Sequence, residues 1–400
     1  MTLTNPKQYY SRFLKGHEGK LHFAAHSHHF WPDVTRVAQL AYWDESAELS
    51  DEKWGKIFSE TIPKTQKHIA SILNLKHPEQ IVLAPNTHEL STRLLSLFLG
   101  KAELRILTTS NEFHSWRRQF LRLMELPQVQ VTQVDSSHFP LSPRGFLEEM
   151  EVQLSLHYDV VFLSQVFFDS GAALTDAEIL QLVNAAPKST LFVVDGYHGF
   201  AAIPTDLSKL EGRIFYLGGG YKYAQGGEGV GFMVVPKGDW RPAYTGWYAD
   251  HAHLSKVPGA QVGYSENAMA FMGATQDPSG FYRFNAVWDL FATEKITVSE
   301  IHAYVSSLQQ LFIQGLPEAF LQKWHLVPLY RPEITWHGHF LTYEAESPEA
   351  AEKCQEALKK VQVLIDRRGP RLRFGFGLYQ DETDVRELLA CLEKLAGEKA

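Results

Sequence analysis

The sequence is poor in the features that mark several classes of protein. Its 400 residues include only two cysteines, Cys354 and Cys391, so neither a disulfide framework nor a cysteine-based zinc site can form. No apolar run is long enough to span a bilayer, and residues 1–16 lack the apolar core of a signal peptide. We therefore expect a protein of a reducing compartment and predict that it is cytoplasmic.

Positive charge is also in short supply. The chain has 38 Lys and Arg against 46 Asp and Glu, a net charge of -8, and no block of Lys and Arg. This balance argues against partners such as nucleic acid or an acidic membrane surface.

A nucleotide-binding oxidoreductase is disfavoured as well, because no G-x-G-x-x-G follows an early strand and no Walker lysine motif is present. We expect a small-molecule substrate.

The most informative stretch covers residues 191–231. Two apolar runs, residues 191–194 and 214–217, end at Asp195 and at three glycines followed by Tyr221-Lys222-Tyr223. Such runs, bounded by glycine, are typical of strands buried on both faces of a parallel sheet. Ligands bind at the carboxyl ends of these strands, so Asp195 and Lys222 are expected at the same edge.

An acid and a lysine at one sheet edge suggest a particular cofactor. Taken singly, Asp195 could cap a turn and Lys222 could lie on a solvated loop. Together they match pyridoxal 5'-phosphate, which needs a lysine for an imine and an Asp at the pyridine nitrogen.

The same stretch resembles the class V aminotransferase family, and in particular its kynureninase-like members. The shared pattern is an Asp, two residues, a His, and later Tyr-Lys-Tyr before a Gly-rich strand. Asp195, His198, Tyr221, Lys222 and Tyr223 stand at these positions. The resemblance implies a fold-type I pyridoxal-phosphate enzyme that acts as a homodimer with shared active sites. Lys222, Asp195 and His198 would then be its catalytic residues, with Lys222 forming the Schiff base.

Strands and helices alternate over residues 80–235, which predicts an α/β fold with a mostly parallel sheet. The resemblance adds a smaller C-terminal α/β domain. We predict an N-terminal segment at residues 1–30 that joins the small domain, a large cofactor-binding domain at 31–283 and a small domain at 284–400.

Further site residues follow from the resemblance alone. It places the cofactor phosphate at a strand-to-helix turn, here Thr87 and His88, where a helix N-terminus would favour an anion. The other implied cofactor contacts are Phe113 against the ring, Ser164, Tyr221, Trp247 and Thr275. The implied substrate contacts are Arg373, His28 and Thr275.

Arg373 is one of four arginines in a basic loop at residues 366–380, with Arg367, Arg368 and Arg371. A guanidinium suits a substrate carboxylate, although basic loops are mostly solvated. Only Arg373 stands where the family has its carboxylate-binding arginine.

Four histidines, His22, His26, His28 and His29, fall within eight residues. No carboxylate or cysteine accompanies them at a ligand spacing, so we predict no metal site.

The predicted activity is hydrolytic Cβ-Cγ cleavage of L-kynurenine or a related aryl-keto amino acid. Trp116, Thr275 and residues 167–171 depart from the kynureninase pattern. A class V aminotransferase of other specificity therefore stays an alternative, as does a catalytically idle binding protein on this fold. The positions of the two cysteines argue against a cysteine desulfurase.

Overall fold

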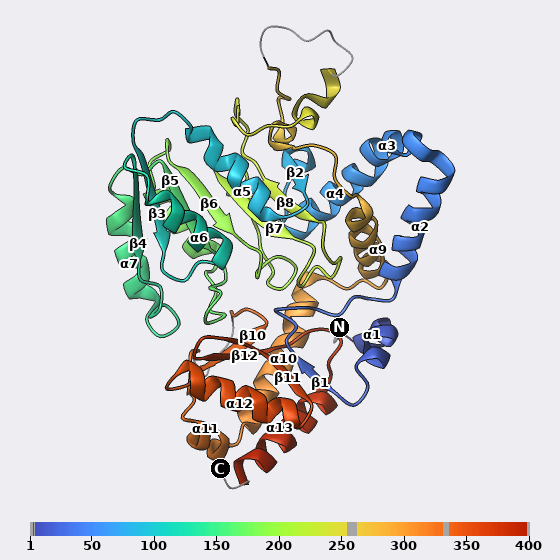
Figure 1. Ribbon diagram of the computed structural model, residues 1–400, viewed down its shortest axis with the longest axis vertical. Coiled ribbons are helices and arrows are strands. Elements are labelled where there is room, and N and C mark those ends of the chain that lie inside the picture. Colours follow the sequence, from blue (N-terminus) through green and yellow to red (C-terminus); the bar gives the residue numbers. More distant parts are fainter. Residues whose placement is uncertain (1–2, 4, 254–261, 331–335, 398–400) are drawn as a thin grey trace.

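The computed structural model describes residues 3, 5–253, 262–330 and 336–397. It contains a seven-stranded and a five-stranded sheet, each covered by helices, so the predicted α/β class with a large and a smaller sheet is confirmed. In Figure 1 the large sheet lies in the upper part of the molecule and the small sheet in the lower part. No helix in the described part of the chain combines the length and apolarity needed to cross a membrane.

The large sheet is mostly parallel, as expected. In spatial order its strands are β2 (Ile81–Ala84), β8 (Gly231–Val234), β7 (Ile214–Gly219), β6 (Leu191–Asp195), β5 (Val160–Ser164), β3 (Leu104–Thr109) and β4 (Val129–Val134). Only β8 is antiparallel to its neighbours, β2 and β7. The chain returns from β7 to β8 without a helix, whereas a parallel neighbour would need a crossover connection.

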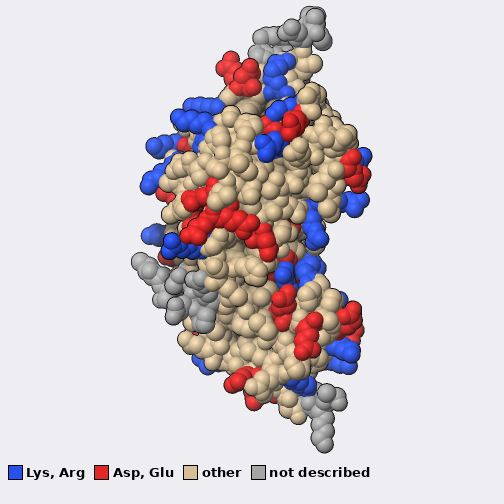
Figure 2. Space-filling view, turned by 90° about the vertical axis from the view of Figure 1, so that its left-hand side faces the viewer, with Lys and Arg blue, Asp and Glu red and all other residues tan. Residues whose placement is uncertain are grey.

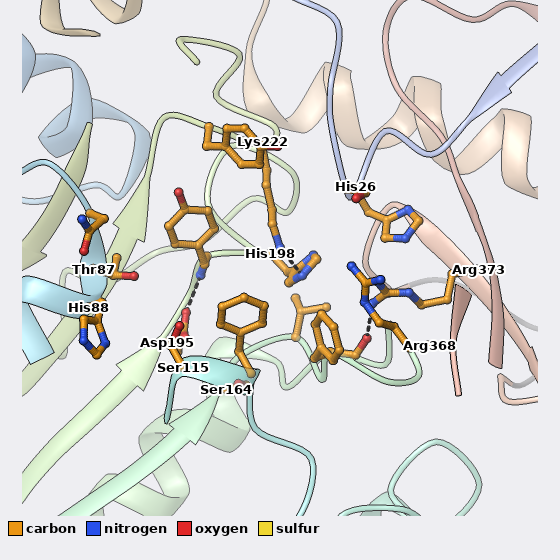
Figure 3. A pocket seen from close by; sticks show the side chains of 17 residues that line it. His26, Thr87, His88, Ser115, Ser164, Asp195, His198, Lys222, Arg368 and Arg373 are labelled. Atoms are coloured by element: carbon orange, nitrogen blue, oxygen red, sulfur yellow. Dashed lines mark hydrogen bonds between the residues drawn. The ribbon is translucent and has the colours of Figure 1, made fainter. Parts of the chain in front are cut away.

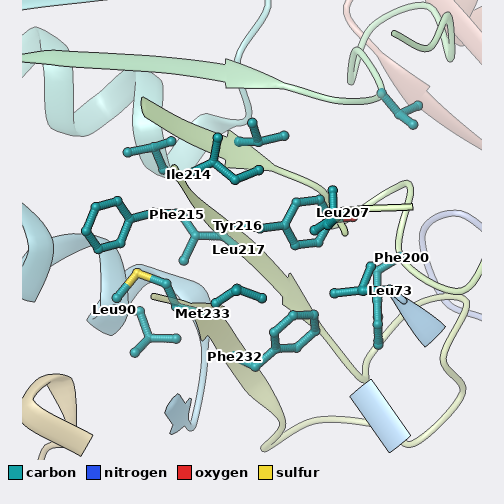
Figure 4. Close-up of a cluster of buried hydrophobic side chains, with 14 of the residues drawn as sticks. Leu73, Leu90, Phe200, Leu207, Ile214, Phe215, Tyr216, Leu217, Phe232 and Met233 are labelled. Carbon is teal, nitrogen blue, oxygen red and sulfur yellow. The ribbon is translucent and has the colours of Figure 1, made fainter. Parts of the chain in front are cut away.

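The apolar runs that predicted buried strands are buried. Every residue of β5, β7 and β8 is inaccessible to solvent or nearly so. Figure 4 shows Phe215, Leu217 and Met233 of β7 and β8 packed with Leu90, a residue of the helix that follows β2. This core fixes the edge of the sheet at which Asp195 and the loop after β7 emerge.

Helices cover the large sheet. They are α2 (Val34–Leu49), α3 (Lys53–Lys56), α4 (Ile62–Ile72), α5 (Thr87–Leu95), α6 (His114–Leu123), α7 (Pro143–Leu154), α8 (Asp176–Ala185) and α9 (Ser279–Thr293). Residues 53–72 are helical throughout, as α3, a π-helical turn (Ile57–Thr61) and α4. The backbone stays right-handed helical through both junctions, and Pro63, which has no N–H to donate, lies just after the π-helical turn.

The small sheet joins the two ends of the chain. Its strands, in spatial order, are β1 (Leu21–Phe23), β11 (Val363–Arg368), β12 (Arg371–Gly375), β10 (Phe340–Glu344) and β9 (Val327–Pro328). Its helices are α10 (Val298–Gly315), α11 (Glu318–Trp324), α12 (Pro348–Lys360) and α13 (Glu382–Gly397), and α1 (Ser11–Gly16) precedes β1. Strand β1 pairs in parallel with β11, so the N-terminal segment is part of this sheet.

The prediction of a basic loop at the arginines was wrong. Residues 363–375 form the antiparallel hairpin of β11 and β12, which turns at Gly369 and Pro370. Sequence analysis missed β12 because arginines alternate with apolar residues there. That alternation is the period of a half-buried strand.

The boundary predicted at residues 283 and 284 falls inside α9. This helix packs along α2 and against α4, so its whole length lies with the large sheet. The three-part division of the chain stays a prediction.

The excess of acidic over basic residues is visible on the surface. Figure 2 shows acidic side chains in a band across the middle of the face that carries α7, with Lys and Arg placed mostly at its edges. This face offers no continuous basic patch.

Candidate active site

A cavity of about 510 Å³ lies at the carboxyl ends of the parallel strands, between the large and the small sheet. Most of the predicted site residues line it together: Thr87, His88, Phe113, Ser164, Asp195, His198, Tyr221, Lys222 and Arg373. In Figure 3, Thr87 and His88 lie at one side of the cavity and Arg373 at the other, with Asp195 and Lys222 between them.

Asp195 and Lys222 emerge from neighbouring strands. Asp195 is the last residue of β6, and Lys222 follows β7, the parallel neighbour of β6. The carboxylate of Asp195 accepts a hydrogen bond of 2.9 Å from the N–H of Tyr197. The Nζ of Lys222 is hydrogen-bonded to Nε2 of His198. His198 thus contacts the lysine.

The electrostatics of these groups follow from their burial. Burial lowers the pKa of Lys222 to about 7, with the charge of Arg373 adding to this and that of Asp195 opposing it. Burial, together with Lys222 and Arg373, also lowers the pKa of His198 well below its usual value. Burial raises the pKa of Asp195, against the N–H of Tyr197 and the charge of Lys222. At neutral pH the site therefore holds a neutral imidazole and a large fraction of uncharged amine.

The phosphate end of the cavity is the N-terminus of α5. The side chain of Asn86 accepts a hydrogen bond from Glu89 N, which leaves the earlier N–H groups of the first turn, those of Thr87 and His88, without a helical acceptor. Strand β8 packs closely here: a Cβ on Gly231 would lie 2.7 Å from Cα of Asn86 and 2.9 Å from N of Thr87. The residue at position 231 must therefore be a glycine.

The side chain of Phe113 lines the cavity near Lys222. Phe113 precedes α6, and its ring centroid is 5.7 Å from Nζ of Lys222. Ser164 is the register partner of Asp195 in β5 and also lines the cavity. Behind Ser164, the buried side chain of Glu112 shares a 2.6 Å hydrogen bond with its hydroxyl.

The opposite end of the cavity is built on the hairpin. Arg373 is buried, donates a 2.8 Å hydrogen bond to the carbonyl of Phe168 and lies 4.3 Å above the ring of the same residue. It is paired with Asp366, its register partner in β11. Arg368 and His26 line the cavity beside this pair.

The residues fit pyridoxal phosphate. The free N–H groups of α5 suit a phosphate, Asp195 suits a ring nitrogen, and Lys222 is an amine of lowered pKa beside both. Nδ1 of His198 is buried without a hydrogen-bond partner, as expected of a group that a bound molecule would approach.

Three predicted residues lie outside this cavity. Trp247 and Thr275 are exposed, and His28 stacks on Trp31 with its ring centroid 5.8 Å from that of Tyr221. Trp116, which departs from the kynureninase pattern, is buried against Phe162 in the core.

Sequence analysis missed Glu112, His26, Arg368 and Asp366 as site residues. Reading residues 363–375 as a hairpin would have placed Asp366 opposite Arg373. His26 depends on the pairing of β1 with β11, which no local pattern reveals.

Neither cysteine lies at the cavity, since Cys354 is on α12 and Cys391 on α13. No cluster of three or more His, Cys, Asp or Glu side chains able to hold a metal was found in the described ranges.

The family described as Aminotransferase class-V matches residues 23–328. No curated protein sequence matches the chain.

Solved structures similar to the chain include two of C-DES. The cystine C-S lyase C-DES in complex with its product cysteine persulfide has a TM-score of 0.81 at 19% identity, over 97% of this chain and 100% of that one. A C-DES mutant with glycine covalently linked to the PLP cofactor has a TM-score of 0.81 at 18% identity, over 98% and 99%. The apo cysteine desulfurase from Thermococcus onnurineus NA1 has a TM-score of 0.80 at 17% identity, over 99% of both chains. At these identities the likeness shows the fold alone.

Proposed function

The chain belongs to the class V aminotransferase family, whose match spans most of its length, and from this premise we propose that it transforms an α-amino acid through Lys222. One observation carries the proposal. The buried amine of Lys222, with a pKa near 7, shares one cavity with Asp195, the N-terminus of α5 and Arg373.

Each of these groups has a distinct task. Lys222 would hold the cofactor, pyridoxal 5'-phosphate, through its amine, and an incoming amino acid would release that amine. The released amine could then take the Cα proton, because with a pKa of about 7 a large fraction of it is uncharged at neutral pH. His198 holds that amine through Nε2.

Asp195 and Arg373 fix the two ends of the reacting assembly. A carboxylate at Asp195 keeps a proton on the ring nitrogen, and the bound cofactor supplies an electron sink for the bond broken at Cα. Arg373 orients the substrate through its carboxylate, as a planar donor of two hydrogen bonds can. Phe113 lines the cavity and would cover the cofactor ring, and Ser164 lies beside Asp195.

For the bond that is broken, we retain the kynureninase-like reaction as the first candidate. In that reaction water adds to the side-chain ketone and the Cβ-Cγ bond breaks. The motif from Asp195 to Tyr223 supports it, as do the aromatic rings of Phe113 and Phe168 at the cavity.

Carbon–sulfur bond cleavage is a second candidate. The solved structure of C-DES was determined with cysteine persulfide as its product, in which the sulfur stays on free cysteine. Such a reaction needs no thiol of the protein. That suits a chain whose two cysteines lie on α12 and α13, away from the cavity.

Three incubations separate the outcomes. The purified protein, loaded with pyridoxal phosphate, is given L-kynurenine, L-cystine, or an amino acid with a keto acid. Anthranilate supports the first candidate, a persulfide the second, and a new keto acid supports transamination. If the protein attaches the cofactor through Lys222 but turns over none of these substrates, a binding role on this fold is favoured. If Lys222→Ala keeps the absorbance of attached cofactor, the proposal fails.

We also propose a homodimer. Val37, Leu40 and Trp43 expose apolar side chains on α2, and Trp247 is half exposed. Trp247 and Thr275 do not line the cavity of their own chain, so any contact with cofactor would be made in a second copy. A cytoplasmic location is proposed from the two free cysteines.

A further inference from the structure

Asp366 stands between two arginines at the substrate end of the cavity. The β11–β12 hairpin sets Asp366 directly opposite Arg373, and Nη2 of Arg373 is hydrogen-bonded to Oδ2 of Asp366. The other oxygen, Oδ1, lies 3.1 Å from Nη1 of Arg368. Both arginines line the cavity, so a carboxylate of the protein already takes up part of their positive charge.

The charge at this end of the cavity can be counted. Burial raises the pKa of Asp366, but the hydrogen bond from His26 and the charge of Arg373 lower it more, so the group is a carboxylate at neutral pH. His26 lies 3.5 Å from Asp366, and burial together with Arg373 lowers its pKa to about 3, so it is neutral. Two guanidinium groups and one carboxylate leave a single positive charge.

The hydrogen bonds of Arg373 leave part of its donors unused. Arg373 gives Nη1 to the carbonyl of Phe168 and Nη2 to Asp366, whereas its Nε is buried and has no partner. A buried donor without an acceptor is costly unless a ligand supplies one. One incoming carboxylate would neutralise the remaining charge.

A second carboxylate would find no cation at this end. The third cation among the residues that line the cavity is Lys222, which is engaged by the cofactor under the proposed function. The neighbouring surfaces are apolar, since Arg373 lies 4.3 Å from the ring of Phe168 and 5.5 Å from that of Phe340. Burying an unpaired charge among such groups is strongly unfavourable.

We propose that Asp366 is a specificity-determining residue, which restricts the site to α-amino acids with a single carboxylate. The inference rests on the proposed function and names the class of its substrate. Acidic amino acids are rejected because their second carboxylate would meet Asp366 instead of an unpaired arginine.

Ligands that bind without reacting test this directly. The protein loaded with pyridoxal phosphate is titrated with α-methylalanine and with α-methylaspartate, which lack a Cα proton, and the change in cofactor absorbance gives each dissociation constant. In the wild type we expect α-methylaspartate to bind at least tenfold more weakly, roughly the effect of one unpaired buried charge. In Asp366→Asn the ratio of the two constants should fall by about tenfold.

Two further variants keep the result interpretable. Glu352→Gln removes an exposed carboxylate that lies 3.2 Å from Arg367, a residue of the β11–β12 hairpin. This variant should leave the ratio of the two dissociation constants unchanged. Arg368→Gln removes the surplus positive charge, so both ligands should bind more weakly and the preference against α-methylaspartate should widen. This variant decides the matter if Asp366→Asn does not fold.

The inference is overturned if the wild type binds α-methylaspartate as tightly as α-methylalanine, if a folded Asp366→Asn leaves the ratio unchanged, or, where that variant does not fold, if Arg368→Gln leaves it unchanged. The proposed function fails in a different way. In that case the wild type shows no cofactor absorbance that depends on Lys222, or neither ligand changes it, and the inference falls with it.

Discussion

Glu112 and Ser164 share a buried hydrogen bond of 2.6 Å directly behind the cofactor side of the cavity. Glu112 also accepts hydrogen bonds from Thr109 Oγ1 at 2.7 Å and from Ser164 N at 3.2 Å. Burial raises the pKa of Glu112 to about 8, against the hydrogen bonds of Ser164 and Thr109, and the charge of Asp195 adds to the rise. At neutral pH Glu112 is thus a protonated acid that fixes the orientation of the Ser164 hydroxyl.

Glu112→Gln should therefore imitate the wild type near neutral pH. The unfolded chain titrates this acid near 4.5 and the folded chain near 8, so the wild type loses stability as the pH rises through this window. From pH 5 to pH 8.5 we expect the variant to gain about 2–4 kcal/mol in free energy of unfolding relative to the wild type. Urea denaturation at both pH values measures the free energy of unfolding. If the difference between the variant and the wild type is the same at pH 5 and at pH 8.5, the prediction is wrong.

The amine of Lys222 should attach the cofactor at unusually low pH. Because its pKa is near 7, the rate at which the cofactor-free protein takes up pyridoxal phosphate should rise with pH and level off a little above 7. Stopped-flow absorbance follows the reaction. Lys222→Ala should abolish it, whereas Lys209→Ala, at an exposed position, should not alter it. A rate that keeps rising to pH 10 would contradict the lowered pKa.

Gly231→Ala should damage the phosphate end of the cavity. The added methyl group would meet backbone atoms of Asn86 and Thr87, which cannot move aside without shifting the start of α5. We expect a loss of about 1–3 kcal/mol in stability and at least tenfold weaker cofactor binding, roughly the effect of losing one or two hydrogen bonds. Fluorescence titration with pyridoxal phosphate measures the affinity. Gly212→Ala, where a Cβ meets nothing within 4 Å, is the matched control and should bind normally.

Acid should destabilise the protein through its buried histidines. Burial lowers the pKa of His337 to about 4, although a backbone hydrogen bond to Phe340 opposes the shift. The unfolded chain binds this proton near 6.5, so the stabilisation present above that pH is lost as the pH falls toward 4. His337→Gln should reduce the loss between pH 7 and pH 5 by about 2 kcal/mol. The control is His138→Gln, because the wild-type side chain of His138 is 81% exposed. If both variants lose the same free energy of unfolding between pH 7 and pH 5, His337 is not the origin of the loss.

Trp43→Glu should separate the proposed dimer. The side chain is 66% exposed on α2, next to Leu40 and Val37, and a charge there would oppose burial against a second copy. Sedimentation velocity should show a dimer for the wild type and a shift of at least tenfold in the dissociation constant for the variant. Val152→Glu, at an equally exposed position on α7, should remain dimeric. If the wild type sediments as a monomer, the proposal of a homodimer is wrong.

The sequence predicted the centre of the site better than its edges. Asp195 and Lys222 each follow an apolar run. Strands built from such runs are expected to lie side by side in a buried sheet. The capping boxes at Thr175 and Thr297 formed as their spacing suggests, because a cap needs only residues three positions apart.

What escaped prediction depends on pairings between distant parts of the chain. Asp366 acquires its role only when the hairpin register sets it opposite Arg373. His26 reaches the cavity because β1, more than three hundred residues earlier in the chain, pairs with β11. Nothing local distinguishes Glu112 from a surface acid, since its burial comes from the neighbouring strand β5.

The pairing of β1 with β11 also bears on how the protein is made. A ribosome delivers the N-terminal strand first, yet its partner emerges only after residue 363 has been synthesised. The growing chain must keep the segment around His26 unpaired through nearly all of translation. The large sheet can be complete by then. We therefore expect the phosphate end of the cavity to form on the ribosome before the substrate end.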